Sequence, residues 1–154
     1  MGAIMMKTKR FSKGLFTKYD KQARQATIDY LKHIGFSAVE NDNKYAQDLV
    51  VVGEIDTYPE KYFVECEVKA VWRGSHFPYP NVQLPYRKKK FFNKPTQFFI
   101  WNEDCTRAAT FWSHDVKPLQ PVEVQNVHIA KGEYFYQIPL DMVRFVDRDP
   151  DKSL

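Results

Sequence analysis

Residues 62–70 read Tyr62-Phe63-Val64-Glu65-Cys66-Glu67-Val68-Lys69-Ala70, a pattern that predicts the central strand of a sheet. Side chains alternate between the two faces of a strand, so this stretch has two different faces. One face is apolar and suits a core, whereas the other carries Glu65, Glu67 and Lys69. Charged groups are costly to bury unless they are paired or bound to a metal. The row therefore indicates either a solvent-exposed sheet face with Glu–Lys pairs or a functional site.

The preceding strand is predicted at residues 45–52, with Asp48 just before the apolar run Leu49-Val50-Val51-Val52. Residues 53–61 contain Gly, Asp and Pro and read as the connection of a hairpin. If the two strands pair, Asp48 is expected to face Glu67 or Lys69 across the ladder. An aspartate, a glutamate and a lysine then converge at one end of the sheet.

Other periodic segments surround these two strands. Helical spacing of apolar residues predicts a helix at 17–34. A short basic helix is expected at 86–92, after a loop broken by three prolines. Further strands are expected at 36–40, 97–101, 108–112, 122–129 and 133–138, the last two as a hairpin around Lys131-Gly132. This order predicts an α/β (α+β) fold, a mixed central β-sheet flanked by helices.

Composition limits the class of protein. The 154 residues suit one domain, 1–154, with a basic arm at 1–16 and a core at about 17–145. The net charge of +4 is compatible with a polyanionic partner. No apolar run approaches the roughly 20 residues of a membrane span. Cys66 and Cys105 lack metal-ligand spacing and read as free thiols in a reducing, cytoplasmic compartment.

The chemistry of this residue set is that of a metal-dependent hydrolase. Carboxylates of Asp48 and Glu67 are hard oxygen ligands of the kind that Mg²⁺ binds, and the carbonyl of Val68 between Glu67 and Lys69 is a further candidate ligand. A bound metal lowers the pKa of a water and neutralises charge on a scissile phosphate. Lys69 is placed to orient the water or stabilise the transition state. Asp48, Glu67 and Lys69 are therefore the predicted catalytic residues.

The order Asp48, then Glu67-Val68-Lys69, resembles the PD-(D/E)xK nuclease superfamily of restriction enzymes, Holliday-junction resolvases and repair nucleases. The resemblance covers roughly residues 17–113, and one departure is that Gln47 stands where the motif has proline. It implies a restriction-endonuclease-like core, hydrolysis of DNA phosphodiester bonds and dependence on Mg²⁺, with Mn²⁺ as a substitute. It also implies a homodimer, because two strands must be cut.

Three further residues have roles implied by the resemblance. Asp20 lies on the apolar side of the first helix, either as an additional metal ligand or as an aspartate stabilised by the helix dipole. Glu65 is a candidate second-shell partner of Lys69 or ligand of a second metal, against a plain surface ion pair. Gln83 is a second-shell candidate, because resolvase-like members carry a glutamine after the ExK strand.

Basic residues follow the predicted central strand. They are candidate phosphate contacts, although such charge runs also form simple solvated faces. These residues are Arg73, Arg87, Lys88, Lys89 and Lys90.

Three functions compete at this point. The first is a Mg²⁺-dependent endonuclease, structure-selective in the manner of a resolvase. The alternative is a catalytically inactive nucleic-acid-binding module with a nuclease-like fold. A third is a structural protein whose Glu and Lys face is plain sheet surface. The structure and sequence of the substrate, and the choice of DNA over RNA, stay open.

Overall fold

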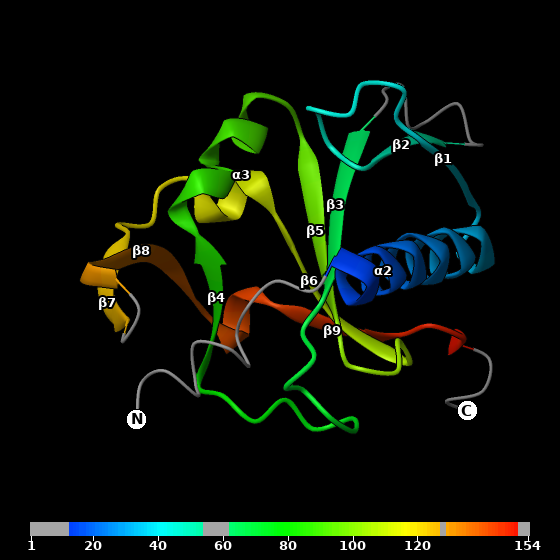
Figure 1. Ribbon diagram of the computed structural model, residues 1–154. Coiled ribbons are helices and arrows are strands. Elements are labelled where there is room, and N and C mark those ends of the chain that lie inside the picture. The colour runs from blue at the N-terminus through cyan, green and yellow to red at the C-terminus, as the bar shows by residue number, and fades with distance from the viewer. Residues whose placement is uncertain (1–12, 54–61, 127–128, 151–154) are drawn as a thin grey trace.

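The computed structural model describes residues 13–53, 62–126 and 129–150. These residues form a mixed six-stranded sheet, a second three-stranded sheet and a few helices, so the predicted mixed α/β class is confirmed (Figure 1). The helical segments are α2 (Lys13–His33), η1 (Tyr86–Asn93), α3 (Ser113–Val116) and η2 (Leu140–Met142). None of the helices in the described part of the chain is long and apolar enough to cross a membrane.

The strands divide into two sheets. The larger sheet has the order β1-β2-β3-β5-β6-β9 and the smaller the order β4-β8-β7. The strands are β1 (Phe36–Glu40), β2 (Leu49–Gly53), β3 (Tyr62–Val68), β4 (Asn81–Pro85), β5 (Thr96–Trp101), β6 (Arg107–Trp112), β7 (Val122–Asn126), β8 (Ile129–Pro139) and β9 (Arg144–Asp147).

Strand β3 is central in the larger sheet. It pairs antiparallel with β2 and parallel with β5. The antiparallel pairing predicted for these two strands is confirmed, with Leu49 opposite Val64 and Val50 opposite Phe63. Most of their predicted connection, residues 54–61, lies outside the described residues. This register decides which charged side chains meet at the end of the sheet.

Helix α2 covers one face of the larger sheet through small side chains. Ala23, Ala26 and Leu31 are fully buried, which lets the helix approach the sheet closely. A buried polar contact joins the two layers: the Trp101 indole Nε1 donates to the Thr27 hydroxyl oxygen at 2.8 Å. Because both groups are buried, this hydrogen bond fixes the position of α2 over β5.

The opposite face differs from the prediction. We expected helices there, but the three-stranded sheet, η1 and α3 cover it, as Figure 1 shows. Phe98, Ile100 and Phe111 of the larger sheet pack in one apolar cluster with Leu84 and Ile138 of the smaller sheet. The larger sheet is therefore the middle layer of three.

Several predicted boundaries were wrong. Strand β2 begins at Leu49 rather than at Tyr45, because Asn41 and Asn43 hold the preceding residues in turns. The short helix predicted at 86–92 is present as η1, which is a 3-10 helix. Asn126 of β7 pairs with Ile129, the first residue of β8, so Gly132 is not at the hairpin tip. It lies within β8 with a φ of +74°, near an irregularity in the pairing.

We expect Thr27→Val to lower the free energy of unfolding by about 1–3 kcal/mol, because the buried Trp101 N–H loses its acceptor. Thr27→Ser, which keeps the hydroxyl group, is the matched control and should lose less. Urea denaturation followed by tryptophan fluorescence measures both. A Thr27→Val variant as stable as the wild type, or less affected than Thr27→Ser, would contradict the stabilising role of the hydrogen bond.

Candidate active site

Asp48 lies at the end of the sheet, just before β2. Its main-chain N–H donates to Glu65 Oε2 at 3.0 Å, and its own Oδ2 accepts the Cys66 N–H at 3.1 Å. Strand β3 extends past the first residue of β2, so the Asp48 carboxylate satisfies a main-chain donor that the ladder leaves open. The structure thus brings Asp48 together with Glu65, where the sequence had led us to expect Glu67 or Lys69.

Glu65 is buried, with 6% of its surface exposed. Its Oε1 accepts a hydrogen bond from Lys88 Nζ of η1 at 3.1 Å. Neither a surface ion pair nor a partnership with Lys69 describes it: the ion pair is largely buried and its cation comes from the basic segment. Lys88, predicted as a phosphate contact, is therefore part of the carboxylate centre.

The two carboxylates disfavour each other's charge. Burial is the largest cause that raises the pKa of Glu65 to about 7, and the neighbouring Asp48 raises it further, against the opposing effect of Lys88. Burial also raises the pKa of Asp48, while the Cys66 N–H acts in the opposite direction. Raised pKa values mean that it is costly to keep both carboxylates ionised side by side. A nearby cation would relieve this cost.

The other two predicted catalytic residues lie further along the chain, Glu67 on β3 and Lys69 just after it. Glu67 is exposed, and Lys69 places its Nζ at 5.2 Å from the centre of the Tyr79 ring. Val68 is half-buried against the apolar cluster under α2. These residues follow Glu65 towards solvent but do not contact the Asp48–Glu65 pair.

Asp20 lies beside the same centre. Helix α2 begins at Lys13, so Asp20 is not in its first turn and the helix-dipole interpretation was wrong. Asp20 forms an ion pair with Arg24 and lines, with Asp48, a hollow of about 380 Å³. It is thus in the neighbourhood of the carboxylates, with its charge already neutralised in part.

The donor set suits a hard cation only in part. Two carboxylates are ligands of the kind that Mg²⁺ and Mn²⁺ take, and Mg²⁺ keeps several waters in such sites. Within residues 13–53, 62–126 and 129–150, however, no three Asp, Glu, His or Cys side chains form a metal cluster. Asp48 and Glu65 therefore offer a metal two carboxylates, with the remaining coordination positions left to water.

The other predicted binding residues lie outside this centre. Gln83 is exposed on β4 opposite Gln137, and Arg73 pairs with Glu103 at 3.6 Å. The three remaining cations of the basic segment are exposed along η1. They are Arg87, Lys89 and Lys90.

Gln47 is a site residue that sequence reasoning missed. It is 3% exposed, and its Nε2 donates to the Phe91 carbonyl at 3.2 Å and to the Thr96 hydroxyl at 3.0 Å. These bonds join the residue before Asp48 to the end of η1 and the start of β5. The available signal was a polar side chain in place of the motif's proline, next to an apolar strand.

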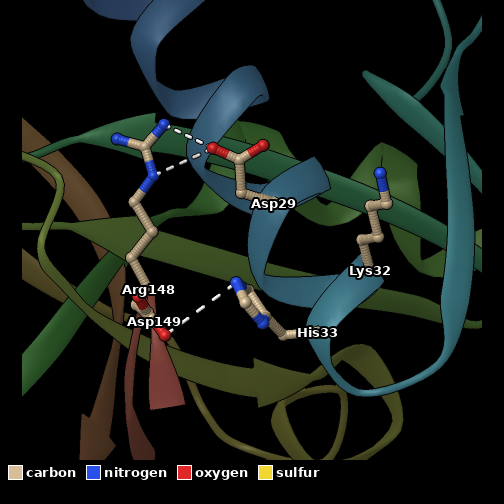
Figure 2. A pocket seen from close by; sticks show the side chains of 5 residues that line it. All are labelled: Asp29, Lys32, His33, Arg148 and Asp149. Carbon is tan, nitrogen blue, oxygen red and sulfur yellow. Dashed lines mark hydrogen bonds and ion pairs between the residues drawn. The ribbon is translucent and has the colours of Figure 1, made fainter. Parts of the chain in front are cut away.

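A larger hollow lies elsewhere, where the end of α2 meets the residues after β9. It measures about 650 Å³ and is lined by Asp29, Lys32, His33, Arg148 and Asp149 (Figure 2). Arg148 holds Asp29 at 2.7 Å, and His33 lies 3.9 Å from Asp149. Four of its five charged groups are thus paired with one another, and none of the predicted site residues lies there.

Comparison of the chain with models of known families, with curated proteins and with solved structures found no match. The candidate site consists of a carboxylate pair where the chain enters β2 beside the middle of β3, a lysine against it, and exposed charged residues leading away from it.

Stability without metal should fall as pH rises from about 4.5 to 7. The folded state binds a proton on Glu65 more tightly than the unfolded state, so this contribution is present below that window and lost above it. The full change is at most about 3 kcal/mol. Urea denaturation in EDTA across this range measures it. Glu65→Gln should flatten the dependence, whereas Glu67→Gln should keep it; a dependence unchanged in Glu65→Gln contradicts the assignment.

Proposed function

We propose that this protein is a Mg²⁺-dependent endonuclease that hydrolyses DNA phosphodiester bonds. The observation that carries the proposal is the Asp48–Glu65 pair, two carboxylates with raised pKa values held together where the chain enters β2 beside the middle of β3. Such perturbed acids in one place are a common mark of functional sites. The free thiols of Cys66 and Cys105 lead us to propose a cytoplasmic location as well.

Each residue of the site has a proposed role that follows from its position. Asp48 and Glu65 would hold the metal, which supplies a water of lowered pKa and neutralises charge on the phosphate. Glu67 is exposed on the same strand face as Glu65 and meets solvent, so it is placed to accept a proton from water. Two ammonium groups are available on either side of Glu67. That of Lys69 lies over the Tyr79 ring, and that of Lys88 pairs with Glu65.

The surface beside this centre suits a polyanion. Four cations in and after η1 are exposed, and in the described part of the chain none of them forms an ion pair with an acid. They are Arg87, Lys89, Lys90 and Lys94. Since Lys88 on the same segment reaches Glu65, a phosphate backbone bound along η1 would pass close to the carboxylates.

A second candidate function is a nucleic-acid-binding module without catalysis. The ion pair between Lys88 and Glu65 favours it, because that lysine already neutralises one of the two carboxylates. The shortage of a third carboxylate at the centre, within the described residues, points in the same direction. This candidate predicts DNA binding without metal-dependent cleavage.

Cleavage of supercoiled plasmid and of a synthetic four-way junction, with Mg²⁺ or with EDTA, tests the nuclease proposal. We expect cutting only with Mg²⁺, reduced at least about a hundredfold in Asp48→Asn and in Glu65→Gln. Asp141→Asn, an exposed acid on η2, is the control and should cut normally. Lys69→Met and Lys88→Met identify the ammonium that serves catalysis. Salt-sensitive binding without cutting under any divalent metal would favour the inactive module.

The phosphate surface is tested by the salt dependence of binding in EDTA. Arg87→Ala and Lys89→Ala should each lower the slope of log affinity against log salt by about 1, since each removes one phosphate contact. Lys32→Ala, an exposed lysine at the end of α2, should leave the slope unchanged. Equal slopes in all the variants would place the DNA elsewhere.

A further inference from the structure

Tyr45 is an exposed aromatic residue on a well-defined turn. Its side chain is 88% exposed, yet its main-chain N–H donates to Asn43 Oδ1 at 2.9 Å, and Ala46 N–H donates to the Asn43 carbonyl at 3.1 Å. Among the described residues its ring makes no aromatic or ionic contact. The backbone is therefore fixed while a large π-face is left in water.

The position of the Tyr45 ring in the fold points to a role in binding. Tyr45 precedes Asp48 on the loop whose residues Lys44, Ala46 and Gln47 line the hollow beside that carboxylate. A second exposed tyrosine, Tyr79, lies just before β4, and the ammonium of Lys69, the residue after β3, sits over its ring. One accessible ring thus shortly precedes Asp48 in the chain, and the other lies against the lysine that follows the strand of Glu65.

The charge around the rings selects the kind of partner. Lys44 is exposed and lies immediately before Tyr45 on the same turn. The Lys69 ammonium lies over the Tyr79 ring. Rings interleaved with cations match a chain of phosphates that carries aromatic bases. A duplex keeps its bases stacked inside, whereas a single strand offers each base face to a ring. The combination of exposed rings and cations therefore fits unpaired nucleotides.

We propose that Tyr45 and Tyr79 stack on unpaired bases, so that the substrate is DNA with a single-stranded segment passing over the Asp48–Glu65 centre. This inference rests on the proposed function in taking DNA as the polyanion. It adds that the site selects strands whose bases are accessible, as in flaps, bubbles or the open arms of branched DNA.

Fluorescence anisotropy in EDTA tests it without cleavage, using a labelled oligothymidine and a labelled blunt hairpin duplex. We expect the wild type to bind the single strand more tightly. Tyr45→Leu should weaken that binding about fivefold or more and leave duplex binding unchanged, because a base loses its stacking partner. Tyr45→Phe should retain the affinity. Tyr134→Leu, a tyrosine 52% exposed on β8, is the matched control.

Two outcomes overturn the inference: tighter binding of the duplex, or single-strand affinity that Tyr45→Leu does not change. Failure of the nuclease proposal is distinguishable from these. Tyr45-dependent binding of the single strand without Mg²⁺-dependent cutting supports the inference and rejects the nuclease. Cutting of duplex DNA with full activity in Tyr45→Leu rejects the inference and keeps the nuclease.

Discussion

The Glu65 carboxylate lies buried within the central sheet, where each of its oxygens needs a partner. One oxygen accepts the main-chain N–H of Asp48, and the other accepts the ammonium of Lys88. These two bonds tie the start of β2 and the segment η1 to the middle strand. Since a buried carboxylate without partners costs far more than a paired one, the positions of all three elements depend on each other.

Alternation along β3 separates Glu65 and Glu67 from Val64, Cys66 and Val68, which pack in the cluster under α2, but it does not say which acid meets Asp48. That depends on the pairing register, which puts Leu49 opposite Val64. The register depends on how the apolar residues pack against α2 and on the length of the connection. The alternation of residues within one strand carries no information about either. The strand pattern alone therefore predicts the exposed Glu67 as a neighbour of Asp48, whereas the structure places the buried Glu65 there.

Periodicity predicted α2 and most strands of the larger sheet, because each buries a regular apolar face. It missed β9 at the edge of the larger sheet, and it missed β4 and with it the second sheet as the third layer. In β4, Val82 and Leu84 alternate with the exposed Gln83, a strand signal that the surrounding prolines obscured. Proline is tolerated there because β4 is an edge strand and Pro85 is its last residue. The position of Lys88 could not be predicted either, because its partner Glu65 is separated from it in the chain by a long loop and the whole of β4.

The substitution of Gln47 for the motif's proline has physical content. A proline would offer no side-chain donor, whereas the Gln47 amide bonds the Phe91 carbonyl and the Thr96 hydroxyl in the protein interior. Asp48 is therefore anchored through its neighbour to the end of η1, and Lys88 lies on that same segment. A shift of η1 would move the lysine and disturb the aspartate together. The two carboxylates and the lysine are thus held as one unit, as a site requires when its charges must be placed before the substrate arrives.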